Sequence, residues 1–210
     1  MTYYGAKHIE TPKIHPVPGR DSSPCVTHGE GPWRQKIYHF LPDMPPSSAG
    51  DELQTEYFVP FDSFISAMND LFEQRHHFNH LVQVTEIRMA LGDDLPMSPL
   101  KGRTCIGVHF TWFRKHEEVL AVLPLIEKTL EKYTVKPHFG KIFDMSGPKF
   151  EELFGEDLNM LRCLTVKHDP FGKFRNNFME RYLFTDSQGP LDEKRLAELE
   201  KRKCPRMAKM

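Results

Sequence analysis

Apolar and polar side chains alternate along residues 53–59, and an alternation with period two predicts a β-strand with one buried face. Two further strands are predicted from Leu81 to Ala90 and from Arg103 to Phe113, with a loop rich in glycine and proline between them. The last of these strands has one apolar face. Its other face is small and hydrogen-bonding, formed by Cys105, Gly107, His109 and Thr111.

Helical periodicity appears twice between and after these strands. The first helix is predicted to begin after Asp62 or Ser63 as N-cap. Its expected buried stripe consists of Phe64, Ile65, Met68, Leu71 and Phe72. A second helix is predicted from about 117 to 133, and Pro124 is expected to kink it or to separate its first turn.

The remaining elements complete an α+β pattern. Residues 135–143 are predicted as a strand or an extended loop, followed by short helices around 149–154 and 157–166. The order β-α-β-β-α-β-α predicts an antiparallel or mixed sheet covered by helices. More than half of the 17 prolines fall within the first 60 residues, which excludes a long helix or a central strand in the arm before the strand at 53–59. We therefore expect an extended arm over 1–51, one domain over 52–185 and a charged tail over 186–210.

Charge and composition exclude several classes of function. The chain of 210 residues carries 28 Lys and Arg against 29 Asp and Glu, so binding to nucleic acid or to an anionic membrane driven by charge is disfavoured. No apolar run approaches the ~20 residues that a membrane span needs, and no secretory signal opens the chain, so we expect a cytoplasmic protein. The 4 cysteines form no CxxC pair, and neither a metal site nor a disulfide framework is predicted.

Candidate chemistry is concentrated on the predicted strands. Glu86 and Arg88 lie two residues apart and therefore point to the same face. This pair is either a platform for a polar ligand or an ion pair on an edge strand facing water, and spacing alone favours the ion pair. The neighbouring strand adds His109 and Thr111 on a face that suits the wall of a cavity. Lys141 follows a turn ending in Gly140, which could aim the amine into a site, although a lone lysine is usually a solvated charge.

Five motifs together resemble the C-terminal substrate domain of FAD-dependent sugar and polyol oxidases. These enzymes are the alditol (xylitol) oxidases and the D-arabinono-1,4-lactone oxidases of the vanillyl-alcohol oxidase superfamily. The resemblance covers roughly Pro16 to Phe184. The motifs are Thr85-Glu86-Ile87-Arg88, Asp93-Asp94 with Ser98-Pro99, His109-Phe110-Thr111-Trp112, Lys136-Pro137-His138-Phe139-Gly140-Lys141, and Asp169-Pro170-Phe171-Gly172-Lys173-Phe174 with Asn176 or Asn177.

The resemblance implies oxidation of an alcohol of a small polyol or aldonolactone, with hydride transfer to flavin and reduction of dioxygen to hydrogen peroxide. It implies that Glu86 and Thr111 bind substrate hydroxyls, with His109 close by. Arg88 and Lys141 are implied to hold the reacting hydroxyl and to favour negative charge on the reduced flavin. All five residues are therefore candidate substrate-binding residues, and Arg88 and Lys141 are also the candidate catalytic residues.

The resemblance is incomplete, because nothing in Met1 to Pro60 is similar to the family's flavin-binding segment. FAD would then be bound mainly by a domain or subunit outside this chain, and the isolated chain is expected to be inactive. The alternative is a non-catalytic remnant that acts as a binding module. If a flavin domain is missing, the face that carries Glu86, Arg88 and Thr111 should open toward solvent. Burial of that face under the chain's own helices would favour the remnant.

Overall fold

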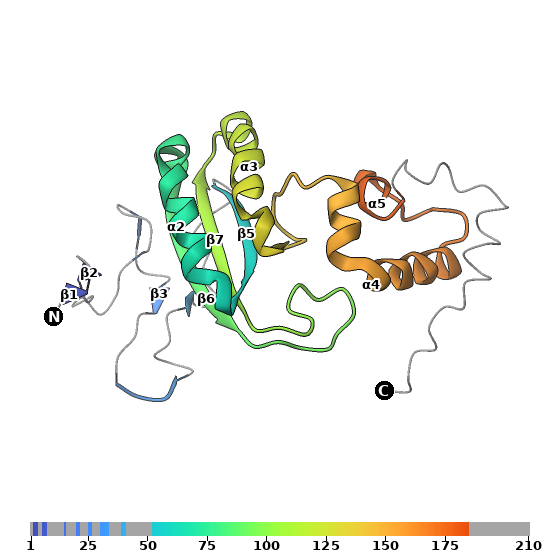
Figure 1. Cartoon of the computed structure of the whole chain (residues 1–210), viewed down its shortest axis with the longest axis horizontal. Coiled ribbons are helices and arrows are strands. Elements are labelled where there is room, and N and C mark those ends of the chain that lie inside the picture. Colours follow the sequence, from blue (N-terminus) through green and yellow to red (C-terminus); the bar gives the residue numbers. More distant parts are fainter. Residues whose placement is uncertain are drawn as a thin grey trace.

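The computed structural model describes residues 52–184 continuously, together with residues 2–3, 6–7, 15, 20–21, 25–26, 30–33 and 39–40. The fold of residues 52–184 carries the candidate site and is shown in Figure 1. The arm expected over 1–51 and the tail expected over 186–210 lie almost wholly outside the described residues, so these boundaries remain predictions.

Four strands form the central sheet, in the order β6-β7-β5-β8. They are β5 (Glu52–Pro60), β6 (Val82–Ala90), β7 (Cys105–Phe113) and the short β8 (Lys136–Pro137). Every pairing is antiparallel, and β7 lies between β6 and β5. The three long strands have the bounds that their alternation predicts to within two residues. The α+β prediction is therefore confirmed, with an antiparallel rather than a mixed sheet.

Two helices cover one face of this sheet (Figure 1). They are α2 (Phe64–Gln74) and α3 (His116–Leu130), and α3 runs through Pro124 as a single element. Tyr57, Val108 and Trp112 point from the strands into the same apolar core as the buried side of α3. Because side chains alternate along a strand, Glu56, Gly107 and His109 must point to the opposite face.

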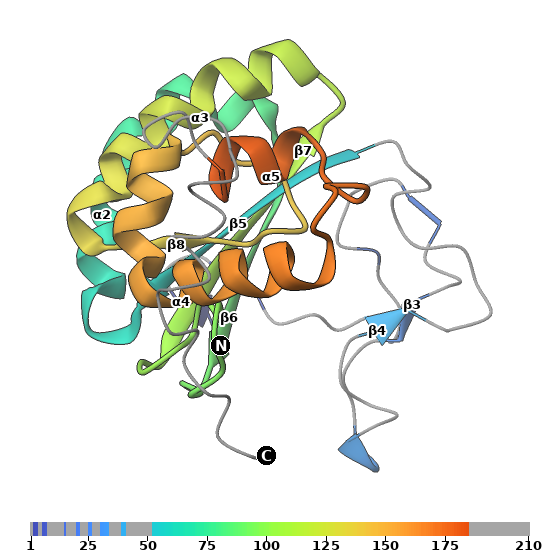
Figure 2. The ribbon, with the colours of Figure 1, turned by 90° about the vertical axis from the view of Figure 1, so that its right-hand side faces the viewer.

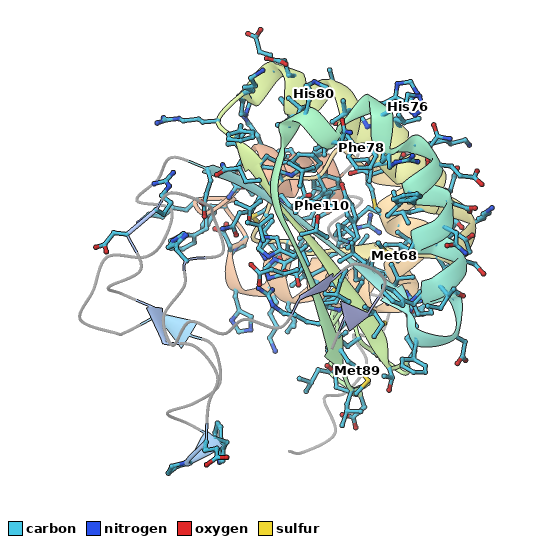
Figure 3. The ribbon with its side chains drawn as sticks, turned by 90° about the vertical axis from the view of Figure 1, so that its left-hand side faces the viewer. Met68, His76, Phe78, His80, Met89 and Phe110 are labelled. Carbon is cyan, nitrogen blue, oxygen red and sulfur yellow. The ribbon has the colours of Figure 1, made fainter. Side chains whose placement is uncertain are left out.

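The buried stripe predicted for α2 is wrong at two positions. Ile65 and Phe72 are 68% and 63% exposed, whereas Ala67 and Leu71 are buried. The helix contacts the sheet along the line of Ala67 and Leu71. Ile65 and Phe72 lie to the sides of this line and therefore remain exposed. Beside them lies an apolar groove of about 340 Å³ between α2 and β6, lined in part by Met68, Phe78 and Phe110. Figure 3 shows these three side chains where α2 crosses the sheet.

The C-terminal helices lie beyond β8 (Figure 2), and a second apolar cluster joins them. The first is α4 (Gly147–His168), which is interrupted at Gly155 with φ 47° and so corresponds to the two short helices predicted. The second is α5 (Asn177–Tyr182), which was not predicted, because six residues are too few to show a period. Phe150, Phe154 and Tyr182 form the centre of the cluster. Within the described part of the chain, no helix combines the length and apolarity that crossing a bilayer requires.

Candidate active site

The candidate site is built from rows of residues paired across three strands. Glu56 on β5, His109 on β7 and Glu86 on β6 are directly paired in one row. The adjacent row contains Gly107 and Arg88. Both rows lie on the sheet face opposite α2 and α3. Antiparallel register therefore brings together charged residues that are far apart in the sequence.

Lys141 reaches these rows because the chain after β8 continues along the edge of β5. The His138 N–H donates to the Glu56 carbonyl at 2.9 Å, and the Ile142 N–H donates to the Gln54 carbonyl at 2.9 Å. Between them, the Gly140 N–H donates to His138 Nδ1 at 3.0 Å and closes a tight turn. This turn directs the Lys141 amine inward, where Nζ donates to Glu56 Oε2.

A single ionic network joins the four charged residues. Arg88 Nη2 donates to Glu86 Oε2, and Arg88 Nη1 donates to Glu56 Oε1 at 3.3 Å. Glu56 is therefore shared between Arg88 and Lys141. Two carboxylates face two cations, so the network is balanced in charge. His109 Nδ1 lies at its edge, 3.6 Å from Glu86 Oε1 and 3.4 Å from Arg88 Nη2.

Burial differs sharply across the network. Glu56 and His109 are only 5% and 4% exposed, whereas the side chains of Glu86 and Arg88 are 39% and 49% exposed. Burial lowers the pKa of His109 to about 4, with the Lys141 charge acting in the same direction, so its imidazole is neutral at pH 7. Burial by itself would raise the pKa of Glu56, but the hydrogen bond and charge of Lys141 and the charge of Arg88 lower it. Glu56 is thus a carboxylate held in its ionised form.

His109 also carries a buried polar atom without a partner. Among the described residues, Nε2 of this imidazole makes no hydrogen bond. A buried nitrogen of this kind costs free energy unless something satisfies it. No group of three or more His, Cys, Asp or Glu side chains in the described part of the chain is arranged to hold a metal ion.

The structure brings together four of the five residues singled out from the sequence. Glu86, Arg88, His109 and Lys141 belong to the network, whereas Thr111 is one row away on the same face, opposite Gln54. The expectation that this face opens toward solvent holds for Glu86 and Arg88 on the outer strand. It is wrong for Thr111, which is 5% exposed.

Sequence reasoning missed Glu56, the most connected carboxylate of the site. The signal that could have found it is the alternation along β5, which places Glu56 on the face of the strand that points away from the core residue Tyr57. Its register partner His109 identifies the same face on β7. A carboxylate on the polar side of a strand usually faces water, and nothing local distinguishes this one.

An antiparallel sheet with helices on one face and a polar network on the other is compatible with the substrate or cap domain of an oxidoreductase. The D-arabinono-1,4-lactone oxidase family matches residues 51–182, and this chain belongs to that family. The chain is also 33% identical over 175 residues to the alditol oxidase of Streptomyces sp. (strain IKD472 / FERM P-14339). That match covers 82% of this chain and 42% of the relative, so the chain spans about two fifths of the relative's length.

Proposed function

We propose that this chain is the substrate-binding half of an FAD-dependent sugar-alcohol or aldonolactone oxidase. The observation that carries the proposal is the meeting of Glu86 and Arg88 on β6 with Lys141 after β8, around Glu56 and His109. Membership of the D-arabinono-1,4-lactone oxidase family supports it. A bound flavin would supply the redox chemistry, accepting hydride from the alcohol and returning electrons to dioxygen to give hydrogen peroxide.

The residues of this chain fit one part of that task. The exposed carboxylate of Glu86 can accept hydrogen bonds from substrate hydroxyls, and the Thr111 hydroxyl lies on the same face. Arg88 and Lys141 can donate to the oxygen of the reacting alcohol and stabilise negative charge that develops nearby. His109 is neutral at pH 7, so it adds no positive charge.

The same residues fit the edge of a flavin ring but not its phosphates. Two cations beside a buried imidazole would favour negative charge on a ring placed against them. Residues 52–184 contain no GxGxxG or GxxxxGK[ST] segment that could hold a pyrophosphate. The flavin-binding part must then come from another domain or subunit. Ile87 and Met89 on β6 are 48% and 65% exposed, but they alternate with Glu86 and Arg88 and lie on the other face of the strand, so they are not part of the site.

The direct test is a hybrid oxidase in which the full chain replaces the matching region of the Streptomyces alditol oxidase. We expect peroxide production from sugar alcohols or aldonolactones, and loss of it in Lys141→Met. Lys128→Met is the matched control, because the Lys128 side chain is 80% exposed on α3. A hybrid that folds and holds flavin but oxidises none of these substrates would contradict the proposal. The chain purified alone should be colourless.

A non-catalytic binding module is the second candidate. It is favoured by the balance of charge in the network, since Glu56 and Glu86 compensate Arg88 and Lys141 without any ligand. Under both candidate functions, titration of the full chain with xylitol or with an aldonolactone, followed by NMR, should show binding without turnover. Only the hybrid oxidase separates the two candidates, because a module would bind these ligands and leave the hybrid inactive.

A further inference from the structure

Glu56 holds both cations of the site, although nothing in its local sequence marks it as functional. Lys141 Nζ donates to Oε2 and Arg88 Nη1 donates to Oε1, so each oxygen has its own cationic partner. Among the described residues, Glu56 is the only carboxylate paired with Lys141, whereas Arg88 also pairs with Glu86. Glu56 is 5% exposed, and a buried carboxylate of this kind must remain paired.

The reach of Glu56 to Arg88 depends on a glycine. Glu56 lies on β5 and Arg88 on β6, so the contact must cross β7, which runs between them. Gly107 occupies the crossing point, because a Cβ atom there would lie 2.9 Å from Glu56 Oε1. That distance is too short for a real contact. The missing side chain of Gly107 therefore leaves the space in which the carboxylate lies across the strand.

We propose that Glu56 is a positioning residue, which fixes the Lys141 amine and the Arg88 guanidinium relative to each other and keeps Glu86 available to substrate hydroxyls. The proposal rests on the proposed function above for the role of the two cations. With Glu56 present, Lys141 has an acceptor of its own and Arg88 is held from two sides. Without it, Lys141 would lose its carboxylate and Glu86 would be the one remaining anion of the network. Glu86 would then pair with cations instead of hydroxyls.

The test measures the two cations directly on the full chain. Lys141 is 15% exposed at its side chain, so an amine-reactive acetylating reagent should modify it slowly compared with Lys128, which is 80% exposed. In Glu56→Gln we expect the ratio of Lys141 to Lys128 modification, read by peptide mass spectrometry, to rise several-fold. Glu152→Gln is the matched control, because Glu152 pairs on the surface with Lys149 and not with the reference Lys128. An unchanged ratio in Glu56→Gln would overturn the proposal.

A second variant keeps the proposal testable if Glu56→Gln fails to fold. Gly107→Ala should push the carboxylate off β7, because the contacted oxygen is the end of a flexible side chain that can move. We expect modification of Arg88 by a dicarbonyl reagent to increase several-fold, while Lys141 stays protected. Equal release of both cations, or of neither, would show that Glu56 does not bridge them.

The kcat of the hybrid oxidase per folded molecule is a measurement that would not change if the role of Glu56 were purely structural. Misplacing a catalytic group by about 1 Å can cost ~100-fold in rate, so Glu56→Gln should lower kcat strongly. KM should rise as well, because Glu86 would pair with cations instead of substrate hydroxyls. If activity falls only in proportion to the amount of folded protein, so that kcat per folded molecule is unchanged, Glu56 has a structural role and does not position the cations. If the unmodified hybrid is inactive, the proposed function fails, and the labelling ratios still decide whether Glu56 positions the two cations.

Discussion

Mild acid should destabilise this chain, because the His109 imidazole is buried in its neutral form. The pKa of His109 is lowered from 6.5 to about 4 by burial. Between these values the unfolded chain binds a proton that the folded chain does not, so the free energy of unfolding falls as the pH decreases from 6.5 toward 4. At 1.36 kcal/mol per pH unit, the loss relative to pH 7 is about 2 kcal/mol at pH 5 and about 3 kcal/mol at pH 4.

Urea unfolding between pH 7 and pH 5, followed by circular dichroism, measures this loss. His109→Gln removes the titrating group and should flatten the profile, while His80→Gln, whose imidazole side chain is 56% exposed, should leave the slope unchanged. Glu56 has a lowered pKa, so its stabilising charge is lost only below its ordinary value of 4.5, outside this window. Equal slopes for the parent chain and His109→Gln would refute the assignment of the effect to His109.

Three further substitutions test the packing that holds the site. Thr55→Val leaves the indole N–H of buried Trp112, now 3.1 Å from the Thr55 hydroxyl, without an acceptor, and should cost about 1–3 kcal/mol in urea unfolding. Gly92→Ala places a Cβ 2.8 Å from the Arg103 carbonyl carbon, a backbone atom, and should cost about 1–3 kcal/mol in the same assay; a neutral effect would contradict this close approach. Phe150→Ala empties the centre of the second cluster, and a loss of about 3–5 kcal/mol should expose α4 and α5 to limited proteolysis before the sheet.

The strands could be predicted because each has one face in the core and one face outside it. The alternation along 53–59 and 105–113 identifies both the strands and the face on which Glu56 and His109 lie. The five motifs then indicate the correct family. The start of helix α2 was predicted correctly, with Ser63 as one of the two N-cap candidates, but its buried stripe was predicted too wide, because periodicity cannot report where the sheet beneath a helix ends.

The connections between strands could not be predicted, because they depend on tertiary hydrogen bonds. Lys141 enters the site only because His138 and Ile142 bond to the edge of β5. Glu56 joins the site only because Gly107 leaves room across β7. Neither relation has a local signature, since a lysine after a turn and a glutamate on a strand are ordinary surface residues. The pairing of strands had to be known before their roles could be recognised.

The register of β7 couples folding to chemistry in this chain. A slip of one residue against β5 and β6 would turn His109 toward the helices and Trp112 toward solvent, so the core and the ionic network would be lost in the same event. A sheet mispaired by one residue therefore cannot persist as a folded but inactive species. Burial of Trp112 excludes this slip, and the fluorescence of that tryptophan reports which face of β7 carries His109.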